Sequence, residues 1–592
     1  MEKNTIWAIV LSSIVLIGSM MLQNYFFPPK QQSVVQEQEI ATSDTEVITE
    51  QVIPEEKIIQ TEINATENIP EEQVTVNTGK AKIVLTNKGG DIISYELLEH
   101  NDKDGYVQMA DSISEMNRAC SVSFGNAVNN IINENFVVTK ISDLIYSFSK
   151  EFTVKNVDGS SSTFVLTKKY TFNENDYLFK LDISIDGNDQ MQYLDFNQSA
   201  YTLRTSPQIG PYFDRKKDKY ENRTFMSFTN NKQKKQVLGN NQMKTYDKDY
   251  SWTGVAGKYF TFLVVPETPI NMGDVTYSTQ LDKNDYANAQ VMLTRNPIMQ
   301  NSVTDTYYIY VGPRTEQDLR IYNRSTDNEW KLSGLRLNDS LNTSGLLSWL
   351  EIAMKWIMEM IYKVIPNWGV AIIIMTILLR LVIYPLTKKS SESTLKMQEF
   401  QPKIQELQTK YKDNPEKMNV EMAKLYKETG YNPLMGCLPL LIQFPLIIAM
   451  FNLFNNYFEF RGAMFIPGWI PDLSVGDSIY TLKFNLPLLG NQIRLLPVIY
   501  LISQLFYGKM TSASTPTQSN GQMKFMMYGM PIIFFFIFYN SPSGLLLYWT
   551  VSNILTMIQQ IFINKMMKAK KAEMEKSKEN EIPVFVPRKK KK

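Results

Sequence analysis

The sequence predicts an α+β multidomain membrane protein, in which an antiparallel β-sandwich domain precedes a polytopic α-helical membrane core. Three observations support this fold class. Residues 79–335 alternate apolar and polar side chains in short runs, which is typical of half-buried strands. Five apolar runs follow between Val370 and Ile563, and one more lies near the N-terminus. Several of these runs approach the ~20 residues that an α-helix needs to cross a bilayer.

The composition of the 592-residue chain excludes several kinds of chemistry. Lys and Arg number 61 against 60 Asp and Glu, so the net charge of +1 indicates no particular partner. The only histidine is His100, and the two cysteines, Cys120 and Cys437, lie in a polar and an apolar run. A multi-histidine zinc site and a disulfide framework are therefore not expected. The sequence contains no P-loop and no Gly-rich dinucleotide motif. We predict no catalytic residue, cofactor or metal.

The first 78 residues divide into two segments. Residues 1–28 contain a nearly unbroken apolar run from Ile6 to Leu22, preceded by Lys3. We expect an uncleaved transmembrane anchor, with a cleaved signal peptide as the alternative because the run is short. Residues 29–78 are rich in Gln, Glu, Thr and Val and lack large aromatics. They predict a flexible acidic linker.

The predicted β domain covers residues 79–335. Its first element is a hairpin, with Lys82–Thr86 and Ile92–Leu97 on either side of Gly89-Gly90. Further alternating strands are expected at Ile145–Phe152, Phe164–Phe172, Tyr177–Ile185 and Thr306–Val311. No cluster of ionisable residues stands out in this part of the sequence, so a spacer or scaffold role is as compatible with it as any catalytic role.

An amphipathic helix is expected at residues 343–363. Glu351, Lys355, Glu359 and Lys363 recur at every fourth position among Leu, Trp, Ile and Met. Each Glu precedes a Lys by four residues, the order that favours an ion pair. Such a helix is typical of a membrane surface. The alternative is a core helix of the β domain.

Five membrane-spanning helices are predicted after this amphipathic helix, which makes six spans with the N-terminal anchor. They are placed at residues 366–387, 432–458, 491–508, 524–541 and 543–564. The segments between and after them are a charged helical hairpin at 388–431, loops at 459–490 and 509–523, and a basic tail at 565–592. In the hairpin, Asn414 is a good N-cap and Pro415 suits the first position of a second helical arm.

Lysine residues indicate the orientation. Segment 388–431 carries nine lysines, and the tail ends in Arg588 and four lysines, whereas loop 459–490 has only Arg461 and Lys483. Positive charge concentrates on the cytoplasmic side of membrane proteins. The hairpin and both termini are therefore predicted to be cytoplasmic, with the β domain and loop 459–490 on the other side.

Arg380 is the only charged residue well inside a predicted span. At ~1.5 Å per residue, Lys388 lies about 12 Å further along the helix. An arginine at the centre of a bilayer costs about 2.5 to 3.5 kcal/mol on insertion scales. No Asp or Glu lies deep in another predicted span. The sequence therefore favours a water-filled groove around Arg380, with snorkelling to the cytoplasmic surface as the alternative.

Polar residues at helical spacing support the groove. Thr376, Arg380 and Tyr384 share one face of their helix. Other polar positions in the predicted spans are Trp549, Asn553, Thr556, Gln560, Gln443, Asn452 and Gln504. A polar stripe can also serve only to hold helices together. The unpaired arginine makes the wet groove the better interpretation.

Several motifs in the second half of the chain resemble the core of the YidC membrane insertase family. They are Asn367-Trp368-Gly369, Arg380 to Thr387, Gln401 to Ile404, Leu425 to Lys427, Asn432 to Leu434, Gly436 to Pro445, Pro542 to Tyr548, Ser552-Asn553 and Gln559-Gln560. The outer domain resembles the β domain of the long, diderm-type members through Gly89-Gly90, Gly254 to Phe260 and Val311 to Pro313.

This resemblance implies a membrane protein insertase and chaperone that is not an enzyme. It implies a place in the cell inner membrane with the β domain periplasmic, and nascent membrane proteins as substrates. Activity alone or with the Sec translocon, and contact with ribosomes through the hairpin and the basic tail, follow from it too. Anionic lipids are the other expected partner of the tail.

The resemblance also implies a set of residues for the substrate groove. Arg380 is the groove arginine, Thr376 lies one turn before it, and Tyr548 and Trp549 form an aromatic pair. Family members often carry Tyr where this chain has Trp549, which puts a hydroxyl function there in doubt and leaves stacking against a substrate helix. The complete predicted set is Arg380, Thr376, Tyr384, Gln443, Tyr548, Trp549 and Asn553.

Three other classes of membrane protein are less compatible with the sequence. A secondary transporter usually has internal repeats and acidic residues at mid-membrane. An intramembrane protease needs buried Asp pairs, or a Ser with a His or Lys partner, and the predicted spans offer neither. A simple anchor for the β domain would not need five further spans.

Overall fold

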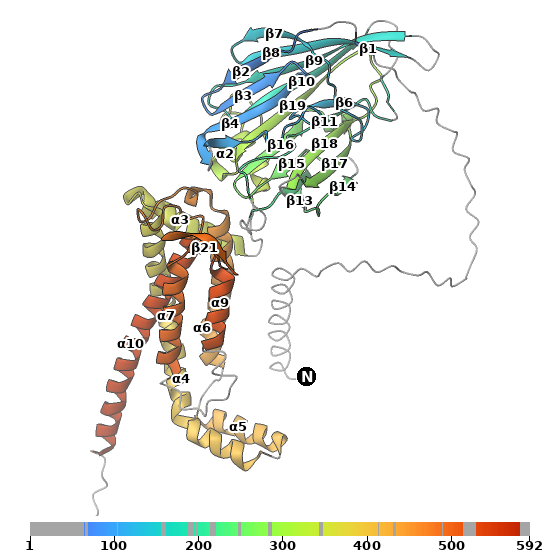
Figure 1. Cartoon of the computed structure of the whole chain (residues 1–592). Helices are drawn as coiled ribbons and strands as arrows, with labels where there is room; N and C mark the ends of the chain where they lie inside the picture. Colours follow the sequence, from blue (N-terminus) through green and yellow to red (C-terminus); the bar gives the residue numbers. More distant parts are fainter. Residues whose placement is uncertain are drawn as a thin grey trace, which may run out of the picture. The chain divides into compact units, whose positions relative to one another are not determined.

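The structure is a computed structural model, and it describes residues 64–65 and 69–579 (Figure 1). Within that range, the residues outside the description are 103–104, 156–160, 188–193, 197, 214–220, 247–249, 282–286, 342–346, 413, 430–433, 488 and 513–527. The predicted N-terminal anchor at 1–28, most of the linker at 29–78, most of loop 509–523 and the last 13 residues of the tail, 580–592, lie outside the described residues.

The β domain is built from antiparallel strands and a few short helices (Figure 1). Its strands are β1 (Asn64–Ala65), β2 (Gln73–Asn77), β3 (Ala81–Thr86), β4 (Asp91–Asp102), β5 (Gly105–Gln108), β6 (Val122–Phe124), β7 (Val137–Ser142), β8 (Ile145–Lys155), β9 (Ser161–Phe172), β10 (Leu178–Gly187), β11 (Tyr201–Arg204), β12 (Thr224–Thr229), β13 (Lys232–Gln236), β14 (Met243–Tyr246), β15 (Trp252–Ala256), β16 (Phe260–Pro266), β17 (Met272–Leu281), β18 (Ala287–Arg295) and β19 (Ser302–Pro313). Its short helices are η1 (Pro269–Asn271), α2 (Glu316–Arg320), η2 (Ile321–Asn323) and η3 (Leu337–Ser340).

These strands form three sheets. The largest has ten strands in the order β1-β8-β9-β10-β19-β16-β15-β12-β13, with β7 paired to β8. A five-stranded sheet has the order β14-β17-β18-β11-β6, and a four-stranded sheet the order β2-β3-β4-β5. The predicted hairpin is β3–β4, and the four further predicted strands are β8, β9, β10 and β19. The prediction of an antiparallel β-rich domain is confirmed.

The β domain begins before residue 79. Residues Gln73–Asn77, predicted as part of the linker, form β2 and pair with β3 in a register that joins Gln73 to Thr86. In this strand Val74 and Val76 alternate with polar residues, and Val76 is buried in the core. The alternation is the normal signature of a half-buried strand. The prediction missed it because the strand continues the polar composition of the linker.

The core of the β domain is rich in large aromatic side chains. The largest side chains that it buries completely include Trp252, Tyr170, Tyr201, Tyr277 and Tyr307. Packing of one sheet on another brings together rings that lie far apart in the sequence, as in the stacked pair of Phe225 on β12 and Tyr277 on β17, whose centroids are 4.7 Å apart. Aromatic side chains bury more area than any other residue type, so they supply much of the driving force for folding.

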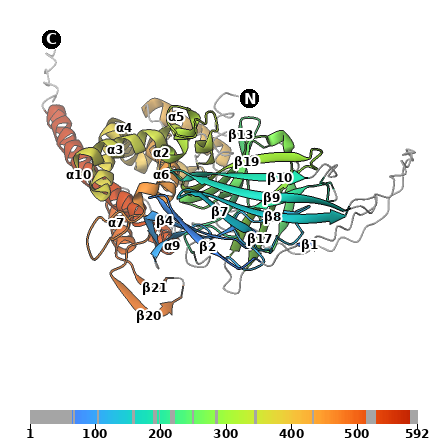
Figure 2. The same ribbon diagram turned by 90° about the horizontal axis from the view of Figure 1, so that it is seen from above.

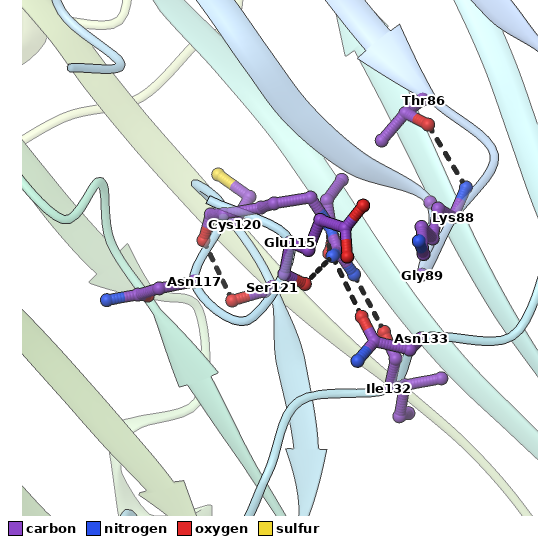
Figure 3. Close-up of polar contacts among 12 residues, drawn as sticks. Thr86, Lys88, Gly89, Glu115, Asn117, Cys120, Ser121, Ile132 and Asn133 are labelled. Atoms are coloured by element: carbon purple, nitrogen blue, oxygen red, sulfur yellow. Dashed lines mark hydrogen bonds and ion pairs between the residues drawn. The ribbon is translucent and has the colours of Figure 1, made fainter. Parts of the chain in front are cut away.

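A cluster of charged side chains is buried between β4, β9 and the segment before β6. Asp91 is completely buried and accepts bonds from Lys168 Nζ at 2.5 Å and from Arg118 Nε at 2.9 Å. Arg118 also donates to Glu115, Ile132 and Asn133, which Figure 3 labels. Burial lowers the pKa of Lys168, with Asp91 acting in the opposite direction. The sequence analysis did not predict this cluster.

The helical region follows the β domain. Its elements are α3 (Ser348–Val364), α4 (Trp368–Lys410), α5 (Pro415–Thr429), α6 (Leu434–Asn456), η5 (Phe458–Phe460), β20 (Tyr480–Leu486), β21 (Gly490–Ile493), α7 (Leu496–Ser512), α9 (Met530–Phe538) and α10 (Ser543–Glu579). Two described helical segments are long and apolar enough to cross a membrane, Trp368–Ser390 and Ser543–Met566. The predicted spans at 432–458, 491–508 and 524–541 correspond in position to α6, α7 and α9, and the total of six spans stays a prediction.

Helix α4 is longer than the predicted span at 366–387. It continues without interruption through Pro385 to Lys410, so the span and the first arm of the predicted hairpin are one helix of 43 residues. Asn367 caps its start, because its Oδ1 accepts a bond of 3.0 Å from Val370 N. The second arm begins at Pro415, and Asn414 Oδ1 accepts from Lys417 N at 3.0 Å. The predicted N-cap is therefore confirmed.

Helix α3 has two apolar faces. Met354 and Met358 are buried in the same hydrophobic cluster as Ala371 and Met375 of α4. Trp349, Ile352 and Trp356, on another face, are each more than 60 % exposed. The buried face shows that α3 packs with the helices, so it is not a core helix of the β domain. Lys355 pairs with Glu359 at 3.7 Å.

A β-hairpin, β20–β21, lies between α6 and α7, where a loop was predicted. Tyr480 pairs with Ile493 and Thr481 with Gln492. The predicted span at 491–508 starts too early, because Gly490–Ile493 is a strand and the helix begins only at Leu496. Figure 2 shows the hairpin extending away from the helix ends.

Candidate functional site in the helical region

Arg380 lies on α4 at a point where α4 packs against α10. Its Nε donates to Ser552 Oγ at 3.0 Å, and its NH2 group donates to the same hydroxyl. The hydroxyls of Tyr548 and Tyr507 lie near enough to interact electrostatically with the guanidinium. Among the residues that the structure describes, Arg380 has no carboxylate partner within ion-pair distance. Within the described chain, the guanidinium is therefore hydrogen-bonded only to a neutral group, and no negative charge compensates it.

Ser552 was absent from the predicted site residues although it belonged to a quoted motif. It is 2 % exposed, so its hydroxyl is available to Arg380 and not to bulk solvent. A second link joins the two helices close by, where Gln559 Nε2 donates to the backbone oxygen of Arg380 at 3.4 Å. Ser552 lies three residues after Trp549 and four before Thr556, in the polar stripe of α10. Helical spacing was therefore the signal that could have found it.

Thr376 and Tyr384 lie one turn before and one turn after Arg380 on α4. Thr376 is completely buried, and its hydroxyl donates to the backbone oxygen of Ile372 at 2.6 Å. This bond within the helix satisfies the hydroxyl. Tyr384 is half-buried. The three predicted residues therefore share a helix face, but they lie in different surroundings.

The aromatic pair on α10 is buried against other helices. Tyr548 is 2 % exposed, and its ring stacks on Phe454 of α6 with centroids 6.0 Å apart. Trp549 is 7 % exposed and contacts Tyr500 of α7 and Phe538 of α9. The indole Nε1 of Trp549 is buried without a hydrogen-bond partner among the described residues. A buried donor of this kind could bond to a group that enters the site.

The other predicted polar residues are spread over three helices. Asn553 Nδ2 donates to Ser503 Oγ of α7 at 3.2 Å, which links α10 to α7. Gln443 is half-buried on α6. No hydrogen bond between described residues connects Gln443 with Arg380. The structure thus brings together Arg380, Ser552 and Tyr548 around one point, with Trp549 and Asn553 on the side of α10 that faces α7.

Comparison with known proteins agrees with this layout. The family model described as "YidC periplasmic domain" matches residues 73–358, and the one described as "60Kd inner membrane protein" matches residues 360–571. Two proteins named "Membrane protein insertase YidC" are similar over nearly the whole chain. The one from Treponema denticola is 45 % identical, covering 96 % of this chain and 100 % of the relative. The one from Treponema pallidum is 36 % identical, covering 95 % and 99 %.

Among solved structures, one of a YidC insertase with its first transmembrane domain resolved covers 93 % of this chain and 98 % of its own, at 16 % identity and a TM-score of 0.32.

A β-rich outer domain joined to helices that suit a bilayer defines this protein as a membrane protein with a folded domain outside the lipid. Full-length similarity and the two adjoining family models specify the family. The chain belongs to the YidC family of membrane protein insertases, whose members insert proteins and are not enzymes in the catalytic sense.

Proposed function

We propose that this protein inserts nascent membrane proteins into the cell inner membrane, and that Arg380 lies in a hydrophilic groove through which the polar end of the substrate passes. The observation that carries the proposal is the guanidinium of Arg380, which is bonded to one neutral hydroxyl inside a helix long and apolar enough to span a bilayer. A cation in that position costs free energy, and such a costly residue usually has a function.

The groove would act by electrostatic attraction. Two unit charges 4 Å apart attract by about 1 kcal/mol in water and by about 4 kcal/mol at an effective dielectric constant of 20. Arg380 has no carboxylate partner among the described residues, so it is available to acidic residues at the end of a passing segment. The apolar helix of the substrate would then move into the lipid, driven by removal of its surface from water.

The aromatic and amide groups would guide the segment. Tyr548 and Trp549 would form the aromatic wall of the groove on α10, and the indole N–H of Trp549, which has no partner among the described residues, would offer a hydrogen bond. Gln443, Tyr384 and Asn553 would hydrate the groove, whereas Thr376 would only support α4, because its hydroxyl is satisfied by Ile372.

The remaining parts of the proposal concern partners and orientation. The helical hairpin of α4 and α5 and the basic tail would lie in the cytoplasm and contact ribosomes and anionic lipids. The β domain would be periplasmic, and insertion would proceed alone or with the Sec translocon. The uneven distribution of lysines supports this orientation.

The test uses purified full-length protein in liposomes and a newly translated single-span substrate with an acidic outer tail. Protection of the tail from added protease measures insertion. We expect Arg380→Ala to lower the initial rate of insertion about tenfold, the equivalent of about 1.4 kcal/mol. Arg380→Lys should keep part of the activity if charge matters more than the geometry of the guanidinium.

Lys388→Ala is the matched control, since it removes the same charge from the same helix about 12 Å away. It should leave the rate unchanged. Equal rates for wild type and Arg380→Ala with every acidic substrate would contradict the electrostatic step while leaving the insertase function in place. Absence of protection by folded wild type would contradict autonomous insertion.

A further inference from the structure

The β20–β21 hairpin is held at its base by a buried network. Asp477 is completely buried, and its Oδ2 accepts from the backbone nitrogens of Leu495 and Leu496 at 2.8 and 2.9 Å. The same oxygen accepts from Trp469 Nε1 at 2.9 Å. A carboxylate that accepts from the first N–H groups of a helix acts as its cap. Asp477 therefore fastens the base of the hairpin to the start of α7.

Arg494 fastens the other strand to α9. Its NH1 donates to the backbone oxygen of Asp477 at 2.8 Å and its Nε to Asn540 Oδ1 at 3.1 Å. Tyr539 closes the same network, because its hydroxyl donates to the backbone oxygen of Gln492 at 2.9 Å. With its base fixed on both strands, the hairpin keeps one direction relative to α7 and α9.

Strand β20 alternates strictly between two kinds of side chain. Successive side chains of a strand point to opposite faces, which separates Tyr480, Leu482, Phe484 and Leu486 from Thr481, Lys483 and Asn485. The pairing with β21 shifts in register between Thr481 and Leu486, so the ladder itself defines the two faces at Tyr480 and Thr481. On the partner strand, Ile493 lies opposite Tyr480, on the apolar face, and Gln492 lies opposite Thr481, on the polar face. The hairpin is therefore amphipathic.

The two aromatic side chains of the apolar face are not covered by the described chain, whereas Leu482 and Leu486 are half-buried. Tyr480 and Phe484 are each 62 % exposed. A two-stranded hairpin is marginally stable in water and needs a further apolar surface to pack on. Grouped exposed aromatics of this kind mark a surface that meets a membrane or a partner.

We propose that this face rests on the hydrocarbon edge of the lipid leaflet opposite the lysine-rich hairpin of α4 and α5. Two observations favour lipid over a protein partner. The hairpin lies between α6 and α7, and β21 ends at Ile493 just before α7 begins at Leu496, so its base lies where the chain enters that predicted span. Its side-chain chemistry also fits an interface, because aromatic residues concentrate at that depth and Lys483, its only charge, lies on the polar face.

The attachment would fix the depth of α7. The described part of this helix, Leu496–Ser512, is about 25 Å long, against the ~30 Å of the hydrocarbon layer. The depth at which its first residue enters the bilayer therefore determines how much of the helix lies in lipid. A hairpin seated at the interface and bonded to the first turn of α7 would hold that end of the helix at the membrane surface. This inference goes beyond insertase activity, and it would stand if the Arg380 mechanism failed.

The test compares the two faces of the hairpin in full-length protein reconstituted into phosphatidylcholine and phosphatidylglycerol liposomes. Nitroxide labels are attached to Phe484→Cys and, separately, to the neighbouring Asn485→Cys, in a Cys437→Ser background. Cys120 is buried and remains. Collisions with oxygen, which concentrates in lipid, and with a water-soluble nickel chelate are measured by power saturation.

We expect the ratio of oxygen to nickel accessibility to be at least about fivefold higher at position 484 than at position 485. The pair Tyr480→Cys and Thr481→Cys repeats the comparison and keeps the test valid if loss of Phe484 disturbs the strand. Equal ratios at both faces would place the hairpin in water and overturn the proposal. Exclusion of both reagents at position 484 would mean that protein covers the face, which overturns it too.

Discussion

Among single residues, Asp91 is the one that holds together the buried charge cluster of the β domain. Its two oxygens are shared between Lys168 and Arg118, and all three side chains are at most 3 % exposed. Removing one member of a buried ion pair leaves an uncompensated charge and costs about 3 to 5 kcal/mol. Here the loss of Asp91 would leave two buried cations facing each other.

We therefore expect Asp91→Ala to lower the free energy of unfolding of the β domain by about 3 to 5 kcal/mol. Urea denaturation followed by tryptophan fluorescence would measure it. The matched control is Asp143→Ala, which breaks the pair of Asp143 with Lys140 on the surface, where the aspartate side chain is 92 % exposed. No measurable change is expected there. Similar losses for both variants would refute the role given to the buried cluster.

His100 offers a second test at this scale, because it is the only histidine in the chain. Its ring lies near Phe260 and Tyr177, with centroids 5.4 and 6.2 Å away. The Tyr177 hydroxyl donates to Glu99 at 2.7 Å, so its oxygen accepts from Nε2–H of His100 at 3.1 Å. Burial lowers the pKa of His100 to about 4.

A pH titration of the Cε1 resonance in histidine-labelled protein, free of any affinity tag, would give a single signal with a pKa near 4. The unfolded chain, with a pKa near 6.5, binds more protons between these two values. His100 should therefore make the fold less stable as pH falls from about 6.5 to about 4. A measured pKa near 6.5 would show that the ring is solvated.

The limits of sequence reasoning at this scale have a physical cause. Arg380 was recognisable because a charge inside an apolar run is unusual wherever the chain folds. The Asp91 cluster was not, because Lys168 lies 77 residues from Asp91 and only the strand pairing brings them together. Helical spacing placed Ser552 in the polar stripe of α10, but its contact with Arg380 depends on how α10 packs against α4.

At the scale of elements, caps and periodicity were the reliable signals. Asn414 and Pro415 located the start of α5 to the residue. The predicted boundary between span and hairpin arm at 387 is not a helix end, because α4 continues without interruption past Lys388. The alternation in β20 was also present in the sequence, but a short strand between two apolar runs is easily taken for a loop.

The cap of α5 predicts that two Asn→Ala substitutions have opposite effects on the stability of this helix. Asn414→Ala removes the oxygen that accepts from Lys417 N and should cost about 1 kcal/mol. Asn419→Ala, in the exposed middle of the same helix, should instead stabilise α5, because alanine is the better helix former. Amide hydrogen exchange over residues 415–421 would become about fivefold faster in the first variant and slower in the second. The same direction of change in both would rule out the cap.

At the scale of the whole molecule, composition was sufficient to predict the division of the chain into a β domain and a helical region. The alternating polar half became the β domain, and the apolar half became the helical region, because burial in a sheet and burial in lipid select different patterns. The number of spans is harder to derive. The described part of α7 has 17 residues, close to the lower limit for a span, and this length alone does not decide whether the helix crosses the bilayer.

The orientation of the molecule can be tested directly, because each side carries an exposed position. Asp143 of the β domain is 92 % exposed, and Lys424 on α5 is 61 % exposed. We expect a membrane-impermeant maleimide to label Asp143→Cys but not Lys424→Cys in cells with a permeabilised outer membrane and an intact inner membrane. Both variants carry Cys437→Ser. After lysis both positions should react, which shows that each is accessible.

We expect this labelling pattern because moving charge across the bilayer is costly. Segment 388–431 carries nine lysines, whereas the 459–490 loop carries one lysine and one arginine, and short segments rich in lysine are retained on the cytoplasmic side. Labelling of Lys424→Cys in intact cells would reverse the orientation of the whole core. The β domain would then be cytoplasmic, and the leaflet proposed for the β20–β21 hairpin would be the inner one. The Arg380–Ser552 contact would be unchanged, so this test of orientation is independent of the proposed groove.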